Sequence, residues 1–154
     1  MLTVNRRLPR DDSRDVPVRL ALDAEERARS RYRFTAEDGT VVELVLDRGT
    51  RLAHGDLLGD AAGTVLVRVV ARPEPVMVVS ARSPADLVRA AYHLGNRHVA
   101  LQLAPDALLL KPDHVLERML RGLGLDVRDD VAPFQPEGGA YLPHHHQGGH
   151  GVFR

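Results

Sequence analysis

The sequence has no cysteine and no tryptophan, and its aromatic residues are limited to three tyrosines and three phenylalanines. Without cysteine, the chain can form neither a disulfide framework nor a thiolate metal site. It also lacks an apolar run of about 18 residues and a charged-then-apolar leader, so we expect no membrane span and no secretion signal. These absences predict a protein of the cytoplasm that has no membrane partner.

The chain has no excess of charge of either sign. Lysine plus arginine and aspartate plus glutamate both number 21, so no basic surplus exists to hold a phosphate backbone. The few aromatic side chains also leave little surface for stacking against bases. We therefore expect no nucleic-acid partner.

No enzyme signature is present. The sequence contains no serine or cysteine nucleophile motif, no glycine loop that cradles phosphate and no HExxH pair of histidines. Its adjacent acidic pairs fall in expected loops or a turn, where carboxylates are more often solvated than catalytic. A binding role is favoured over catalysis, and 44% hydrophobic residues is enough to build the core of one domain or of two small ones.

Residues 1–73 are predicted to form a small all-β domain. Short apolar runs alternate with polar residues there, and glycine turns separate them. Asp23 and Glu26 have the spacing of a one-turn capping box, and Asp38 with Gly39 is expected to close a hairpin. Many short strands at this spacing suggest a barrel or sandwich, with strands expected over residues 16–22, 29–34, 41–46 and 64–70.

Pro73 and Pro75 are expected to make residues 72–75 a stiff connector, since proline disfavours both helix and sheet pairing. We place the domain boundary there. Beyond it, the periodicity predicts the βαββαβ order of a ferredoxin-like domain, with elements over residues 76–79, 83–94, 99–103, 107–110, 113–123 and 125–131. The expected fold is therefore α+β, with an all-β domain over 1–73, a ferredoxin-like domain over 74–143 and a flexible histidine-containing tail over 144–154.

His98 is expected just beyond the end of the first of these helices. Ser83 can cap that helix, and Pro84 suits its first turn. Its buried stripe is expected to comprise Leu87, Val88, Ala91 and Leu94. Gly95 is expected to end the helix in a left-handed conformation and to deliver His98 into a short loop. One imidazole cannot hold a metal, and a two-fold dimer is the simplest source of a second copy of the same residue.

Four further histidines lie near the end of the chain. Neutral imidazole is a good ligand for nickel, copper and zinc, so this cluster is a metal hypothesis. Histidine-rich ends also arise as purification tags or as solvated low-complexity tails, and spacing alone does not separate these readings. The four residues are His144, His145, His146 and His150.

Asp113 and His114 open the second helix, and they also allow two readings. They could form a secondary metal site, or Asp113 could be the helix cap and His114 a solvated residue of the first turn. The buried stripe of this helix is expected to comprise Val115, Leu116, Met119, Leu120 and Leu123.

Three stretches of the chain carry a resemblance to a known family. They read AYHLGNRH over 91–98, DHVLERMLRGLGLDV over 113–127 and APFQPEGGAY over 132–141. In the front half, EERARSRYRF and LDRGTRLAHGDLL fit as well. The chain closely resembles the UreE family of urease accessory proteins, which are nickel metallochaperones, and the match covers nearly its whole length.

The resemblance implies an amino-terminal β domain that binds protein partners and a carboxy-terminal domain that dimerises and holds Ni(II). His98 would bind the metal at the dimer interface, and the tail histidines would supply further ligands. Some members also have a histidine at the position of Pro112, which here offers no donor to a secondary site at Asp113 and His114. The cargo would pass to the urease apoprotein with its accessory proteins, notably the GTPase UreG, while Zn(II) or Cu(II) could compete.

Two other functions are open to test. The first is a non-catalytic adaptor in which the β domain grips a partner and the histidines are incidental. The second is a small ferredoxin-like RNA-binding protein, which would need a basic face and stacking aromatics that this composition does not provide.

Overall fold

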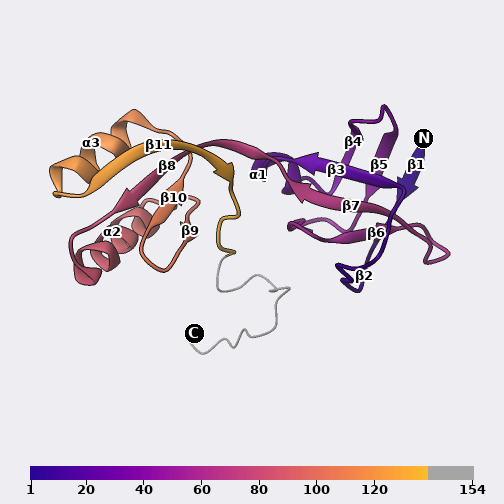
Figure 1. Cartoon of the computed structure of the whole chain (residues 1–154), viewed down its shortest axis with the longest axis horizontal. Helices are drawn as coiled ribbons and strands as arrows, with labels where there is room; N and C mark the ends of the chain where they lie inside the picture. The colour runs from indigo at the N-terminus through magenta and orange to yellow at the C-terminus, as the bar shows by residue number, and fades with distance from the viewer. Residues whose placement is uncertain (139–154) are drawn as a thin grey trace. The chain divides into compact units, whose positions relative to one another are not determined.

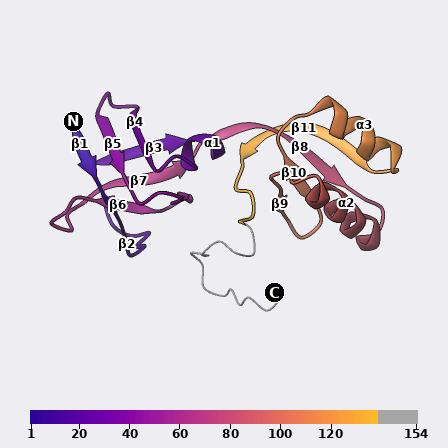
Figure 2. The same ribbon diagram turned by 180° about the vertical axis from the view of Figure 1, so that it is seen from behind.

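The computed structural model describes residues 1–138 and divides into two compact units. The first unit contains Met1–Pro75 together with Val131–Gln135, and the second contains Val76–Asp130 and the residues from Pro136 onward. Figure 1 labels the elements of both units, and Figure 2 shows them from behind. No helix among the described residues is long and apolar enough to cross a membrane.

The first unit is built from strands and a single one-turn helix, as the sequence predicts. Its elements are β1 (Leu2–Val4), β2 (Arg6–Leu8), β3 (Val18–Leu22), α1 (Ala24–Arg27), β4 (Arg31–Thr35), β5 (Val41–Val45), β6 (Leu57–Gly59) and β7 (Val65–Ala71). They form a three-stranded sheet in the order β1-β5-β4 and a four-stranded sheet in the order β2-β6-β7-β3. The sequence analysis does not predict β1, β2 and β6, because three residues are too few to show alternation.

Alternation along the strands decides which side chains of the first unit are buried. In the parallel pair β3 and β7, Leu20 lies opposite Val69, and both side chains are buried. Val42 and Leu44 of the three-stranded sheet belong to the same core cluster, so the two sheets share one interior. Each fully buried valine or leucine contributes roughly 1.5–3 kcal/mol, and this cluster stabilises the packing of the two sheets.

Two local predictions in the first unit are confirmed. The Asp23 carboxylate accepts a hydrogen bond from the Glu26 N–H at 2.8 Å, and the Glu26 carboxylate accepts one from the Asp23 N–H at 2.9 Å, which is a capping box. At the hairpin between β4 and β5, Gly39 has a φ of 86°, a value that suits glycine. Both features depend on near neighbours in the chain, so the sequence alone is enough to predict them.

The connector prediction over 72–75 is wrong. The strand β8 spans Pro73–Ser80, and both of its prolines are exposed at the start of the strand. A proline has a fixed φ that extended backbone accepts, and its missing N–H does no harm where the sheet needs no donor. The division between the units falls within this strand, after Pro75.

The second unit has the predicted βαββαβ order. Its remaining elements are α2 (Pro84–Asn96), β9 (Gln102–Leu103), β10 (Leu108–Leu110), α3 (His114–Gly122) and β11 (Asp126–Pro133). The sheet order is β11-β8-β10-β9. The first and last strands of this unit, β8 and β11, are therefore neighbours, and the hairpin of β9 and β10 pairs with the other side of β8. This is the ferredoxin-like arrangement, and Figure 1 shows both helices with this sheet.

The helices of the second unit bury narrower stripes than the sequence predicts. Ala90 and Leu94 of α2 are buried, as are Leu116 and Leu120 of α3, and they pack with the β8 and β10 side chains. The predicted core residues Val88, Val115 and Leu123 are exposed instead. Consecutive helical residues are about 100° apart around the axis, so Val88 lies on nearly the opposite side of α2 from the buried Ala90 two residues later.

The segment Val131–Gln135 belongs to the first unit, although the sequence analysis places it in the domain over 74–143. Phe134 is completely buried, and the guanidinium of the buried Arg27 donates hydrogen bonds to the carbonyls of Phe134 and Leu22. Burial lowers the pKa of Arg27, while the carboxylate of Glu74, first among nearby acids, opposes that shift. This anchor holds the segment Val131–Gln135 within the first unit.

Candidate metal site

His98 stands at the C-terminal end of α2, but the helix ends later than the sequence predicts. Gly95 is helical rather than left-handed, and the helix continues to Asn96 with Arg97 as its C-cap. The left-handed residue is His98 itself, with a φ of 59°. Among residues 1–138 it is the only residue other than glycine with positive φ.

Two hydrogen bonds explain why the helix ends there. The N–H of Val99 donates to the carbonyl of Leu94 at 3.1 Å, and the N–H of His98 donates to the carbonyl of Gly95 at 3.0 Å. This pair of bonds is a Schellman motif, in which the left-handed position is usually glycine. Val99 packs against the same core cluster as Leu94, which fixes the reversal of the chain.

The motif presents the His98 side chain to solvent from a fixed backbone. The residue is exposed, and within the described residues nothing hydrogen-bonds to its imidazole. A left-handed conformation costs an L-residue about 1–2 kcal/mol, so the fold holds histidine where glycine would be easier. The position therefore combines a solvent-exposed imidazole with a fixed backbone.

Asp113 acts as the N-cap of α3. Its carboxylate accepts a hydrogen bond from the Leu116 N–H at 2.9 Å, and His114 is the exposed first residue of the helix. The capping interpretation of Asp113 is confirmed. The Asp113 carboxylate therefore already has a structural partner. A metal-binding role for Asp113 and His114 stays a prediction.

The described part of one chain does not hold a complete ligand set. Within residues 1–138, no group of three or more histidine, aspartate or glutamate side chains is placed to hold a metal ion. The predicted tail ligands His144, His145, His146 and His150 lie outside the described residues. A metal bound at His98 would therefore need donors from the tail or from a second copy of the chain.

The two remaining histidines, His54 and His93, have local surroundings. His54 accepts a hydrogen bond from the Ala71 N–H through Nδ1 at 3.1 Å. His93 is exposed on α2, and its ring lies 5.6 Å from that of Tyr92. Neither residue joins a cluster of possible ligands within the described chain.

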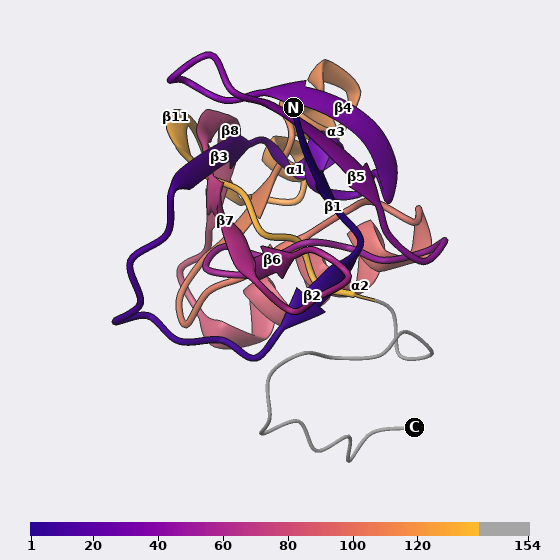
Figure 3. The same ribbon diagram turned by 90° about the vertical axis from the view of Figure 1, so that its right-hand side faces the viewer.

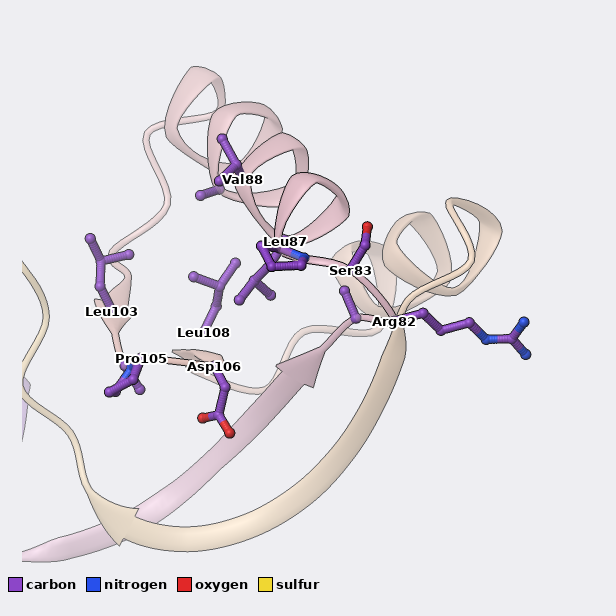
Figure 4. Close-up of a pocket in the computed structure, with 12 residues that line it drawn as sticks. Arg82, Ser83, Leu87, Val88, Leu103, Pro105, Asp106 and Leu108 are labelled. Atoms are coloured by element: carbon purple, nitrogen blue, oxygen red, sulfur yellow. The ribbon is translucent and has the colours of Figure 1, made fainter.

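The sequence analysis missed an apolar surface on the second unit. A groove of about 410 Å³ runs between α2 and the hairpin of β9 and β10, and Figure 4 shows Leu87, Leu103 and Leu108 directed into it. Val88 and Tyr92 of α2 are also exposed. Their i, i+4 spacing indicates a second apolar stripe on α2. The sequence analysis assigns Val88 to the core and gives Tyr92 no role.

Comparison with known proteins identifies relatives of both halves of the chain. Residues 4–72 match the family model of the UreE urease accessory protein N-terminal domain, and residues 74–152 match that of its C-terminal domain. A urease accessory protein UreE from Nostoc punctiforme is 50% identical over 146 residues, which cover 95% of this chain and 99% of the relative.

Two further relatives carry the same name. The protein from Pseudomonas putida is 50% identical over 146 residues, covering 94% of this chain and 87% of the relative. The protein from Verminephrobacter eiseniae is 49% identical over 160 residues, covering 98% and 94%. Proteins of this kind assist urease maturation and are not enzymes. The chain therefore belongs to the UreE family of urease accessory proteins.

Proposed function

We propose that this protein binds Ni(II) as a homodimer in the cytoplasm and delivers it to the urease maturation complex. The ion is cargo, held by His98 from two copies and by histidines of the tail over 144–154. The receiving partners are the urease apoprotein and its accessory proteins, with the GTPase UreG as the direct recipient.

The observation that carries this proposal is the position of His98. Its imidazole is solvent-exposed on a fixed left-handed residue, and residues 1–138 of one chain supply no complete ligand set around it. A two-fold dimer provides a second copy of the same imidazole from an equivalent position. Imidazole suits nickel, although zinc and copper compete for the same donors.

Exposed apolar side chains of the second unit support a dimer formed through this unit. Val88, Tyr92 and Leu103 are 68%, 66% and 53% exposed, which is unfavourable for large apolar groups left in water. Tyr92 precedes His98 by six residues, or about 9 Å along a helix at about 1.5 Å per residue. A second copy packed over this surface would bring two His98 side chains toward each other.

The chemistry of such a site suits a carrier. Structural zinc sites contribute roughly 10–16 kcal/mol, and an ion held that firmly would not be released. A delivery protein needs an affinity near micromolar, about 8 kcal/mol, so that a partner with more ligands can take the ion. Solvent-exposed imidazoles allow this exchange, and binding should weaken as pH falls toward about 6 because imidazole must be neutral to coordinate a metal.

The test is calorimetric titration of Ni(II) into the full chain and a His98→Gly variant, with molar mass measured by light scattering. Glycine keeps the left-handed backbone while it removes the imidazole. We expect at least about a tenfold loss of affinity. His93→Gln is the matched control, since His93 is an exposed histidine of α2, the helix that His98 follows, and it should bind like the wild type. Unchanged affinity and stoichiometry in His98→Gly would remove His98 from the site.

A further inference from the structure

The strand β4 has an open edge. In the sheet order β1-β5-β4 it pairs only with β5, and Figure 3 shows it on the outside of its sheet. It is five residues long, whereas the edge strands β1 and β2 have only three. An edge strand presents backbone donors and acceptors that another extended chain can pair with.

The pairing register shows which backbone groups face outward. Leu46 donates its N–H to the carbonyl of Ser30 at 2.9 Å, and Ala36 donates to Thr40 at 2.8 Å. In an antiparallel pair, alternate residues share these bonds, so the even-numbered residues of β4 face β5. The outward-facing N–H and C=O groups belong to Arg31, Arg33 and Thr35.

The long edge strand β3 of the other sheet is partly covered. The Arg72 side chain donates a hydrogen bond to the carbonyl of Ala21 at 3.4 Å. Arg27 donates a further bond to Leu22 at 3.3 Å. Within the described residues of the first unit, β4 is therefore the longest edge without such a cover.

The open edge is positively charged. Arg33 is 61% exposed and pairs with Glu43 at 3.1 Å, while Arg31 is exposed and makes no ion pair within the described residues. Arg29 lies just before the strand with its guanidinium 4.2 Å from the centre of the Tyr32 ring. Pairing of two copies of β4 would bring these arginines together, and like charges directly opposite each other destabilise a strand pair. The charge disfavours a second copy and favours an acidic partner.

The opposite face of β4 offers an apolar contact. Tyr32 is 46% exposed, and its ring centre lies 4.8 Å from that of the buried Phe34, with the two rings tilted by 48°. A strand added to the edge would place alternate side chains beside the arginines and beside Tyr32. We infer that the edge of β4 binds an extended segment of a partner protein in which acidic residues alternate with apolar ones. This surface contains no histidine, so the inference is independent of the nickel proposal.

The test is a titration of the 15N-labelled full chain, without metal, with a synthetic hexapeptide of alternating glutamate and valine. We expect the amide signals of Arg31, Arg33 and Thr35 to shift and their hydrogen exchange to slow. Arg31→Glu should weaken binding by about tenfold, because one attractive charge pair becomes repulsive. Arg19→Glu is the matched control, since Arg19 is an exposed arginine on β3, and it should bind like the wild type.

Three results would overturn the inference. They are no binding at millimolar peptide, equal binding of a peptide with lysine in place of glutamate, and shifts spread over arginines elsewhere without slower exchange at Thr35. Any of these results would mean that the edge of β4 does not select an acidic extended segment. The exchange measurement needs no variant, so it tests the edge even if Arg31→Glu fails to fold.

Discussion

A pair of substitutions at the end of α2 tests where the left-handed residue lies. Gly95 is helical, and a Cβ added to it would meet nothing within 4 Å. Gly95→Ala should therefore stabilise the protein by about 0.5–1 kcal/mol, because alanine loses less conformational freedom in a helix than glycine does. If Gly95 were instead the left-handed terminus expected from the sequence, the same change would destabilise the protein.

The complementary change is at His98, whose φ is 59°. A Cβ in this conformation costs about 1–2 kcal/mol, and glycine avoids that cost but loses roughly 0.5–1 kcal/mol of unfolded-state entropy. His98→Gly should therefore be about 0.5–1 kcal/mol more stable than His98→Ala. Neither variant has an imidazole, so both should lose nickel affinity to the same extent. The difference in stability between the two variants therefore reports on the backbone alone.

The assay is urea unfolding of the metal-free chain, with the transition of the second unit followed by residue-specific amide signals. We expect Gly95→Ala to unfold at higher urea than the wild type, and His98→Gly at higher urea than His98→Ala. A destabilised Gly95→Ala variant, together with equal midpoints for the two His98 variants, would refute the assignment of the turn.

Three further changes follow from the structure. Arg27→Met should cost about 2–3 kcal/mol in urea unfolding, because it leaves the buried carbonyl of Phe134 without its donor, and an unchanged midpoint would contradict the anchor. Deleting residues 144–154 should lower the number of nickel ions bound per chain or reduce urease activation, while partner binding persists. A plain adaptor with incidental histidines would keep both partner binding and urease activation. Hydrogen bonds from Thr40 lower the pKa of the Asp38 carboxyl, so their stabilisation is complete above the unfolded pKa and is lost as pH falls through the lower folded value. Asp38→Asn should flatten the acid limb of the stability curve, and an unaltered limb would contradict this.

Sequence patterns predict the parts of this fold that depend on near neighbours. The caps at Ser83 and Asp113 each accept an N–H three residues later, so the residue types and spacing are sufficient. The βαββαβ order follows from periodicity, which reports the type of each element. Prolines at the start of β8 misled the analysis because a local preference does not say whether the sheet needs that donor.

Other features depend on tertiary packing and leave no local signal. Arg27 and Phe134 are 107 positions apart, and no spacing rule connects them. The exposure of Val88 depends on what packs against α2, although its helical periodicity is clear. His98 could be named as a candidate ligand, but its left-handed backbone depends on the burial of Val99 with Leu94, which overrides the preference of Gly95 for ending a helix.

The most direct test of the carrier proposal is a crystal structure of the nickel-loaded full chain with anomalous scattering measured at the nickel edge. The proposal expects a nickel peak between two copies of the chain, bonded to the His98 imidazole of each. A nickel peak with no His98 nitrogen in its coordination shell, or a monomer that takes up no nickel, would contradict it.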